Sequence, residues 1–153
     1  RLTGIPGSPL VYNKDYNFKF EEYITLKNGS DLLILATGSI VSQAIIASEI
    51  LSEKNIKCHV ANVHTLKPLS KKINILLAKF KNIITIEEGV LSGGFGSAIG
   101  DFLHDNKFTN KLYRLGIPDQ FIHHGTREEL LNDLGLTPKH VTSILKENKL
   151  IYA

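Results

Sequence analysis

The residues best placed to do chemistry in this sequence are two adjacent carboxylates followed by a cluster of glycines. Glu87 and Glu88 end an apolar run, and Gly93, Gly94 and Gly96 then open a stretch with helical spacing. The N-terminus of a helix presents free N–H groups and the positive end of its dipole, so this loop could bind an anion. The same glycines would also let the helix begin close to the sheet or to another chain, and this second interpretation is favoured.

This loop is therefore predicted to be an anion-binding or interface loop, and its members are Glu88, Gly93, Gly94, Gly96 and Ser97. A dinucleotide site fits less well, because the next glycine is Gly100, one residue later than the usual spacing requires. Adjacent strand residues point to opposite faces, so only one of the two carboxylates can face a given site. An ordinary role, such as capping nearby backbone or pairing with a lysine, is favoured over an acid–base pair.

Other motifs that could take part in catalysis or metal binding give weaker signals. His123 and His124 are adjacent, but no Cys, Asp or Glu stands beside them at the spacing of a metal site, so they are interpreted as polar loop residues. The sequence contains no Gly-x-Ser-x-Gly, no phosphate-binding loop with its lysine and no zinc-ligand spacing. We therefore expect no catalytic residue and no metal ligand in this chain.

Composition restricts the class of protein. The chain has 153 residues, of which 42% are hydrophobic and 22% charged, which is typical of one globular domain. A net charge of +3 with both signs interspersed does not indicate a nucleic-acid or membrane-surface partner, and no apolar run approaches the ~20 residues of a membrane-spanning helix. Cys58 is the single cysteine, so a cytoplasmic location is expected. The chain begins with Arg1 and contains no methionine, so we expect a fragment or a processed form.

The elements that must position these residues alternate along the chain. Strands are predicted at 22–27, 32–36, 58–63, 82–87 and 112–115. Helices are predicted after Ser39 as N-cap, at 70–80 and 93–103, after a capping box of Thr126 and Glu129, and from Thr137. This alternation predicts an α/β protein with a mostly parallel sheet covered on both sides. Residues 1–20 are predicted to be a linker from a preceding domain, and residues 21–153 the domain itself.

Several segments in a fixed order carry a family resemblance. They are Gly29–Ser39, Val63–Leu69, Ile86–Gly89, Gly93–Ser97 and Leu115–Phe121, followed by His124–Thr126 and the Glu-Leu-Leu run after it. Together they resemble the C-terminal domain of transketolase, and even more that of 1-deoxyxylulose-5-phosphate synthase; the equivalent domain of 2-oxo acid dehydrogenase beta subunits is also similar. The resemblance covers nearly the whole chain, although no single segment is specific. Glu88 stands where transketolases often carry histidine, which favours the synthase-like or split-transketolase branch.

The resemblance implies a three-layer α/β/α domain with about five strands in a mixed sheet, of which residues 23–26 form the antiparallel one. It implies a supporting domain of a transferase in carbohydrate metabolism that moves two-carbon units between sugar phosphates. Thiamine diphosphate and Mg²⁺ would be held by the N-terminal and middle domains, or by a separate subunit, and not by this chain. This domain would help to hold a homodimer together. Arg1 stands where these enzymes place an arginine that grips a sugar phosphate, which suits a guanidinium group.

Two other functions remain open. The chain could be a stand-alone module that binds a nucleotide or another anion at the helix start between Gly93 and Gly96, and nucleotides or pyrophosphate would then raise its melting temperature. Alternatively, it could be a structural dimerisation module whose stability no ligand changes. The sequence does not indicate the donor or acceptor sugar.

Overall fold

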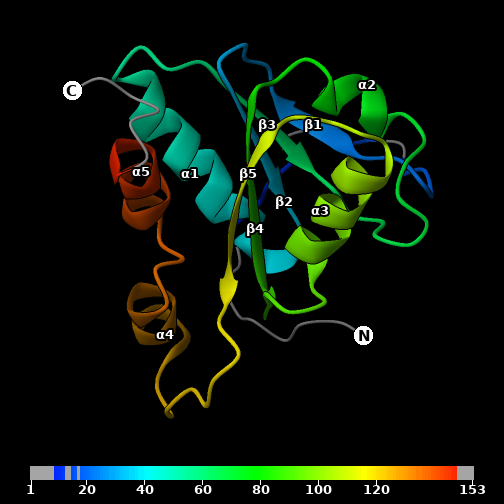
Figure 1. The fold of residues 1–153 in the computed structure, drawn as a ribbon. Coiled ribbons are helices and arrows are strands. Elements are labelled where there is room, and N and C mark those ends of the chain that lie inside the picture. Colours follow the sequence, from blue (N-terminus) through cyan, green and yellow to red (C-terminus); the bar gives the residue numbers. More distant parts are fainter. Residues whose placement is uncertain (1–8, 13–14, 17, 148–153) are drawn as a thin grey trace.

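The computed structural model describes residues 9–12, 15–16 and 18–147, in which five strands form one sheet. The strands are β1 (Ile24–Lys27), β2 (Leu32–Ala36), β3 (Cys58–Asn62), β4 (Asn82–Val90) and β5 (Lys111–Ile117). Their order across the sheet is β1-β3-β2-β4-β5 (Figure 1). Strand β1 runs antiparallel to β3, and all other neighbours are parallel. The mixed sheet and its antiparallel edge strand confirm the expectation drawn from the family resemblance.

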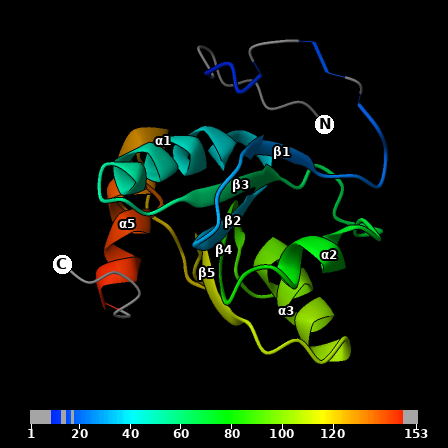
Figure 2. The ribbon, with the colours of Figure 1, turned by 90° about the horizontal axis from the view of Figure 1, so that it is seen from above.

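Helices cover both faces of the sheet and make three layers. The helices are α1 (Val41–Ser52), α2 (Ile73–Leu77), α3 (Phe95–Asp105), α4 (Arg127–Asp133) and α5 (Pro138–Glu147), with a short 3-10 turn at Gly38–Ile40. Helices α1 and α5 lie on one face, and α2 and α3 lie on the other (Figures 1 and 2). The α/β/α architecture is therefore confirmed. Among the residues described, no helix has the length and apolar character needed to cross a membrane.

The apolar run of β2 explains why two helical layers are needed. Leu33 and Leu35 pack in the cluster shared with α2 and α3, whereas Ile34 packs on the opposite side with α1 and α5. Successive strand residues point to opposite faces, so a strand that is apolar at every position must be covered twice. Each fully buried Leu or Ile contributes about 1.5–3 kcal/mol relative to exposure.

The strand order places a switch point between β2 and β4. The chain passes from β2 to β3 on one side and then returns to place β4 on the other side of β2. In open α/β sheets, ligands bind beyond the carboxyl ends of the strands at such a point. The segments that follow β2 and β4 therefore meet at this edge. The predicted anion-binding or interface loop is the segment at the end of β4.

Some predicted boundaries differ from the structure. Helix α2 spans only Ile73–Leu77 instead of 70–80. The side-chain amide of Asn110 donates to the carbonyl of Leu77, the last residue of α2, and to that of Phe80 beyond its end. Strand β4 continues to Val90 because its end pairs with β5 at Ile117. The prediction that Ser39 is an N-cap was wrong: Ile40 occupies that position and makes no side-chain cap.

Candidate functional site at the carboxyl edge of the sheet

The first carboxylate at the end of β4 turns inward and caps helix α3. Glu87 is only 5% exposed. Its Oε2 accepts a hydrogen bond from the N–H of Phe95 at 2.7 Å, and its Oε1 accepts one from the N–H of Gly96 at 2.8 Å. These N–H groups belong to the first turn of α3, where no intrahelical acceptor exists. The chain's own carboxylate thus occupies the position that an external anion would need, and its charge favourably meets the helix dipole.

The glycines in this loop allow the first turn of α3 to approach β4 closely. A Cβ on Gly94 would lie 2.2 Å from the carbonyl oxygen of Val90 and 2.5 Å from Oε2 of Glu87. A Cβ on Gly96 would lie 2.7 Å from the hydroxyl oxygen of Thr85. Both distances are far below van der Waals contact, so any larger residue would push the helix away from the strand. This geometry supports the interpretation in which the glycines serve a close approach to the sheet.

The second carboxylate turns the other way and joins three segments of the chain. The guanidinium group of Arg127 donates from Nε to Oε2 of Glu88 at 3.2 Å, and its second nitrogen donates to Oε1. The hydroxyl of Ser39 donates to the same Oε1 at 3.1 Å. We refer to Ser39, Glu88 and Arg127 as the Glu88 cluster. It connects the turn after β2, the end of β4 and the start of α4.

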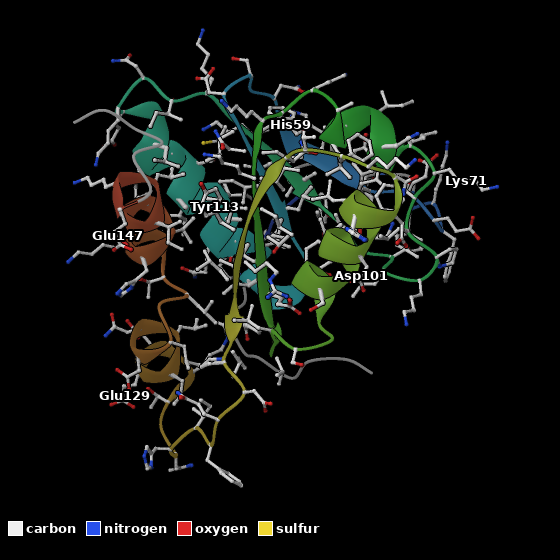
Figure 3. All side chains as sticks on the ribbon, viewed as in Figure 1. His59, Lys71, Asp101, Tyr113, Glu129 and Glu147 are labelled. Atoms are coloured by element: carbon white, nitrogen blue, oxygen red, sulfur yellow. The ribbon has the colours of Figure 1, made fainter. Side chains whose placement is uncertain are left out.

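A capping box completes the start of α4 beside this cluster. The N–H of Glu129 donates to the hydroxyl of Thr126, and the carboxylate of Glu129 accepts from the backbone N–H of Thr126 at 2.8 Å. The hydrogen bonds from Thr126 hold the pKa of the Glu129 carboxyl below its usual value. Figure 3 shows Glu129 on α4, well away from Tyr113, which lies on the α1 side of the sheet. The predicted capping box is confirmed, and together with Arg127 it fixes the direction in which α4 leaves the sheet.

Ser97 fastens the glycine loop to β5. Its hydroxyl donates to the carbonyl of Leu91 at 2.7 Å and accepts from the N–H of Gly93 at 3.2 Å. Arg114 of β5 donates to the same hydroxyl at 2.9 Å. The structure therefore brings together all five residues of the predicted loop and Glu87, for which capping of nearby backbone was favoured. It adds Ser39, Arg114 and Arg127, which sequence reasoning had not assigned to this loop. The remaining candidate, Arg1, lies outside the described residues.

The outer surface of this edge is partly apolar. Phe121, in the segment between β5 and α4, is fully exposed, and Val90 at the end of β4 is 44% exposed. A groove of about 540 Å³ lies between residues 120–125 and α4, and His123 and His124 line it. In the part of the chain that the structure describes, no group of three or more His, Cys, Asp or Glu side chains could hold a metal ion.

The arrangement at this edge is suited to holding loops in place. Glu87 is engaged by two backbone N–H groups, and Glu88 by a guanidinium and a hydroxyl. The Ser39 hydroxyl donates to the same Glu88 oxygen that accepts from the Arg127 guanidinium group, so this carboxylate is shared between the two partners. The result is a set of rigid loops that carries exposed apolar residues on its outer side.

Comparison with known proteins gives a consistent picture. The family model of the transketolase C-terminal domain matches residues 22–141. The 1-deoxy-D-xylulose-5-phosphate synthase of Geobacillus sp. is 46% identical over 123 residues, which cover 79% of this chain and 20% of the synthase. That of Synechocystis sp. is 43% identical over 139 residues, covering 90% of this chain and 22% of the synthase. This chain thus spans about a fifth of the length of these curated relatives.

A solved structure agrees with the sequence matches. It is described as a split gene transketolase, inactive beta4 tetramer, and it superposes with a TM-score of 0.84 at 27% identity. The match covers 92% of this chain and 46% of that one. Even in a split-gene protein, therefore, the region that corresponds to this chain is less than half of the polypeptide.

Proposed function

This chain belongs to the family of transketolase C-terminal domains, and on that basis we propose that it is the supporting C-terminal domain of a thiamine-diphosphate-dependent enzyme. The whole enzyme would transfer two-carbon units between sugar phosphates. The curated relatives are 40–46% identical and are synthases, whereas the solved transketolase is 27% identical. This difference favours the synthase branch of the family over transketolase itself. A cytoplasmic location fits this metabolic role.

The observation that carries this proposal is the use of the two carboxylates at the end of β4. Glu87 fills the anion position at the start of α3, and Glu88 binds Arg127 and Ser39. The described residues at this edge therefore do not fit a diphosphate and its metal ion. Thiamine diphosphate and Mg²⁺ would bind to the N-terminal and middle domains or to a separate subunit. Arg1 is proposed as the one contact of this chain with a substrate phosphate.

The role proposed for this edge is to support a homodimer. Phe121 and Val90 expose apolar surface on loops that the Glu88 cluster and Ser97 hold rigid. Aromatic residues on such preorganised loops are typical anchors of protein interfaces. The dimer expected for the whole enzyme would use this surface together with contacts from its other domains.

Calorimetry with thiamine diphosphate and Mg²⁺ tests the proposal directly. We expect no binding heat from this chain and saturable binding from the full-length enzyme. Stoichiometric binding by this chain would overturn the proposal. Melting temperatures measured with millimolar nucleotide or pyrophosphate test the stand-alone anion-binding alternative, for which an upward shift is required. We expect no shift, because an anion at α3 would have to displace the buried carboxylate of Glu87.

A further inference from the structure

Exposed apolar side chains gather in the segment before β1. Leu10 is 91% exposed and Phe20 is 79% exposed, and about half of Tyr16 and of Phe18 is exposed as well. We refer to these four residues as the apolar strap. The other large exposed hydrophobic residues of the described chain are Ile46 on α1, Ile75 on α2, and Val90 and Phe121 at the carboxyl edge. Single exposed residues need no explanation, but the four residues of the apolar strap lie close together in the sequence, and the ring centroids of Phe18 and Phe20 are 5.6 Å apart, which indicates an interaction surface.

The segment that carries the apolar strap is attached to the domain. The side-chain amide of Asn62 donates to the hydroxyl of Tyr12 at 2.5 Å. The Nε2–H of His64 donates to the carbonyl of Lys19 at 3.0 Å, and the His64 ring lies 4.7 Å from the ring of Phe18. Both attachment points lie at the carboxyl end of β3: Asn62 is its last residue, and His64 lies just beyond it. The strap is thus fixed to the sheet while its apolar side chains point away from the core.

An ion pair holds the end of the same segment, in addition to these hydrogen bonds. Lys72 stands at the start of α2, and Glu22 follows Phe20 by two positions. Nζ of Lys72 lies 2.6 Å from Oε1 of Glu22. The pair is well exposed, so it restricts the direction of the segment before β1 more than it adds to the stability of the domain. Figure 2 shows the chain before β1 standing outside the sheet on its β1 side. This position leaves the strap accessible to a neighbouring domain.

The position of the strap in the sequence indicates what covers it. The family match starts at residue 22, two positions after Phe20, and the matched family is a C-terminal domain. This chain spans about a fifth of the length of its curated relatives and less than half of the split-gene transketolase chain. Because the matched region is a C-terminal domain, the remaining parts of those proteins lie largely N-terminal to it in the sequence.

We propose that the apolar strap is a docking surface on which the preceding domain of the same polypeptide packs. The inference rests on the proposed function, because it requires that a preceding domain exists. Leu10 and Phe20 are the anchors, and Tyr12 and His64 hold the strap in the conformation that presents them. A strap fixed in this way sets the orientation of the C-terminal domain relative to the domain before it. It costs less ordering entropy on docking than a free linker would.

Hydrogen exchange in the full-length enzyme tests this inference. We expect slow exchange in the peptide that carries residues 9–20, and faster exchange there, by about tenfold or more, after Leu10→Ser with Phe20→Ser. A peptide of the preceding domain should lose protection in the same variant. Phe121→Ser is the matched control, because it replaces an exposed aromatic residue at the other surface and should leave the strap protected.

The outcomes separate the inference from the proposed function. Fast exchange of the strap in the unmodified enzyme would overturn the inference. Protection that disappears on dilution, together with the dimer, would identify a second copy as the occupant and would also overturn it. If the full-length enzyme binds thiamine diphosphate while its strap exchanges freely, the proposed function stands and only the docking surface is wrong. If the coding sequence holds no preceding domain, the inference is overturned, whereas the proposed function stands with the cofactor-binding domains on a separate subunit.

Discussion

Replacing Glu87 by glutamine is the most direct test of how the carboxyl edge is held. The carboxylate accepts from two backbone N–H groups at 2.7 and 2.8 Å and is 5% exposed. Glutamine has nearly the same shape but carries no charge and has one amide oxygen. One N–H of Phe95 or Gly96 would therefore face the amide NH₂ group and lose its acceptor. The substitution leaves the packing intact and changes only the electrostatics.

The expected cost follows from three contributions. One buried N–H without an acceptor costs about 1–3 kcal/mol, and weakening the other hydrogen bond from charged to neutral costs about 1 kcal/mol. Loss of the negative charge at the start of α3 costs about 0.5–1 kcal/mol more. We expect Glu87→Gln to lower the free energy of unfolding by about 3 kcal/mol in total. For a domain of this size that corresponds to a decrease of about 6–12 °C in melting temperature.

Urea denaturation followed by circular dichroism measures this loss, with an unchanged slope showing that the unfolded state is not altered. Glu88→Gln is the matched control, since Glu88 is the adjacent carboxylate but its ion pair with Arg127 is partly exposed. It should cost about 1 kcal/mol or less. Equal losses for the two variants would refute the reasoning. So would a Glu87→Gln variant in which the amides of Phe95 and Gly96 exchange as slowly as before.

Three further predictions concern other parts of the fold. Gly96→Ala should destabilise the domain by about 1–3 kcal/mol in thermal unfolding, because its Cβ would overlap the buried hydroxyl of Thr85; an unchanged melting temperature would contradict the close approach. Thr126→Ala removes the capping box of α4 and should cost about 1 kcal/mol in urea unfolding, whereas Thr126→Ser should restore most of it. Burial, and secondarily the charge of Lys79, lower the pKa of His59 below its ordinary 6.5. The unfolded chain therefore binds the proton more readily, and stability should fall as the pH decreases from 6.5 toward the lowered pKa. His59→Gln should reduce this slope, and an identical pH profile in the variant would contradict the assignment.

Features that depend on neighbouring residues could be predicted from the sequence. The apolar run of β2 indicated a strand buried on both faces, and the structure places it at the centre of the sheet. The capping box of Thr126 and Glu129 is a pattern within four positions, and it forms as predicted. The antiparallel direction of β1 was inferred from the family resemblance and not from periodicity, because a single strand carries no information about its direction.

Features that depend on distant residues could not be predicted. The partners of Glu88 are Ser39 and Arg127, which are 49 and 39 positions away and belong to different elements. Ser39 was therefore assigned a local role as a helix cap, although its hydroxyl is used by this carboxylate. Helix α2 was also predicted too long, and at its end the carbonyl of Leu77 accepts from Asn110, which belongs to a remote segment. Strand alternation did show that only one of the two glutamates could turn inward, but not which one.

The strand order has a consequence for the growing chain during synthesis. Strand β2 is the second strand of this domain to leave the ribosome, yet it ends up between β3 and β4, and β4 begins at Asn82. Until that strand emerges, one edge of β2 has no partner and can pair with another nascent chain. Helix α5, whose Val141 and Leu145 help to cover one face, appears later still. A chaperone that protects this domain would thus need to act until its last helix has been translated.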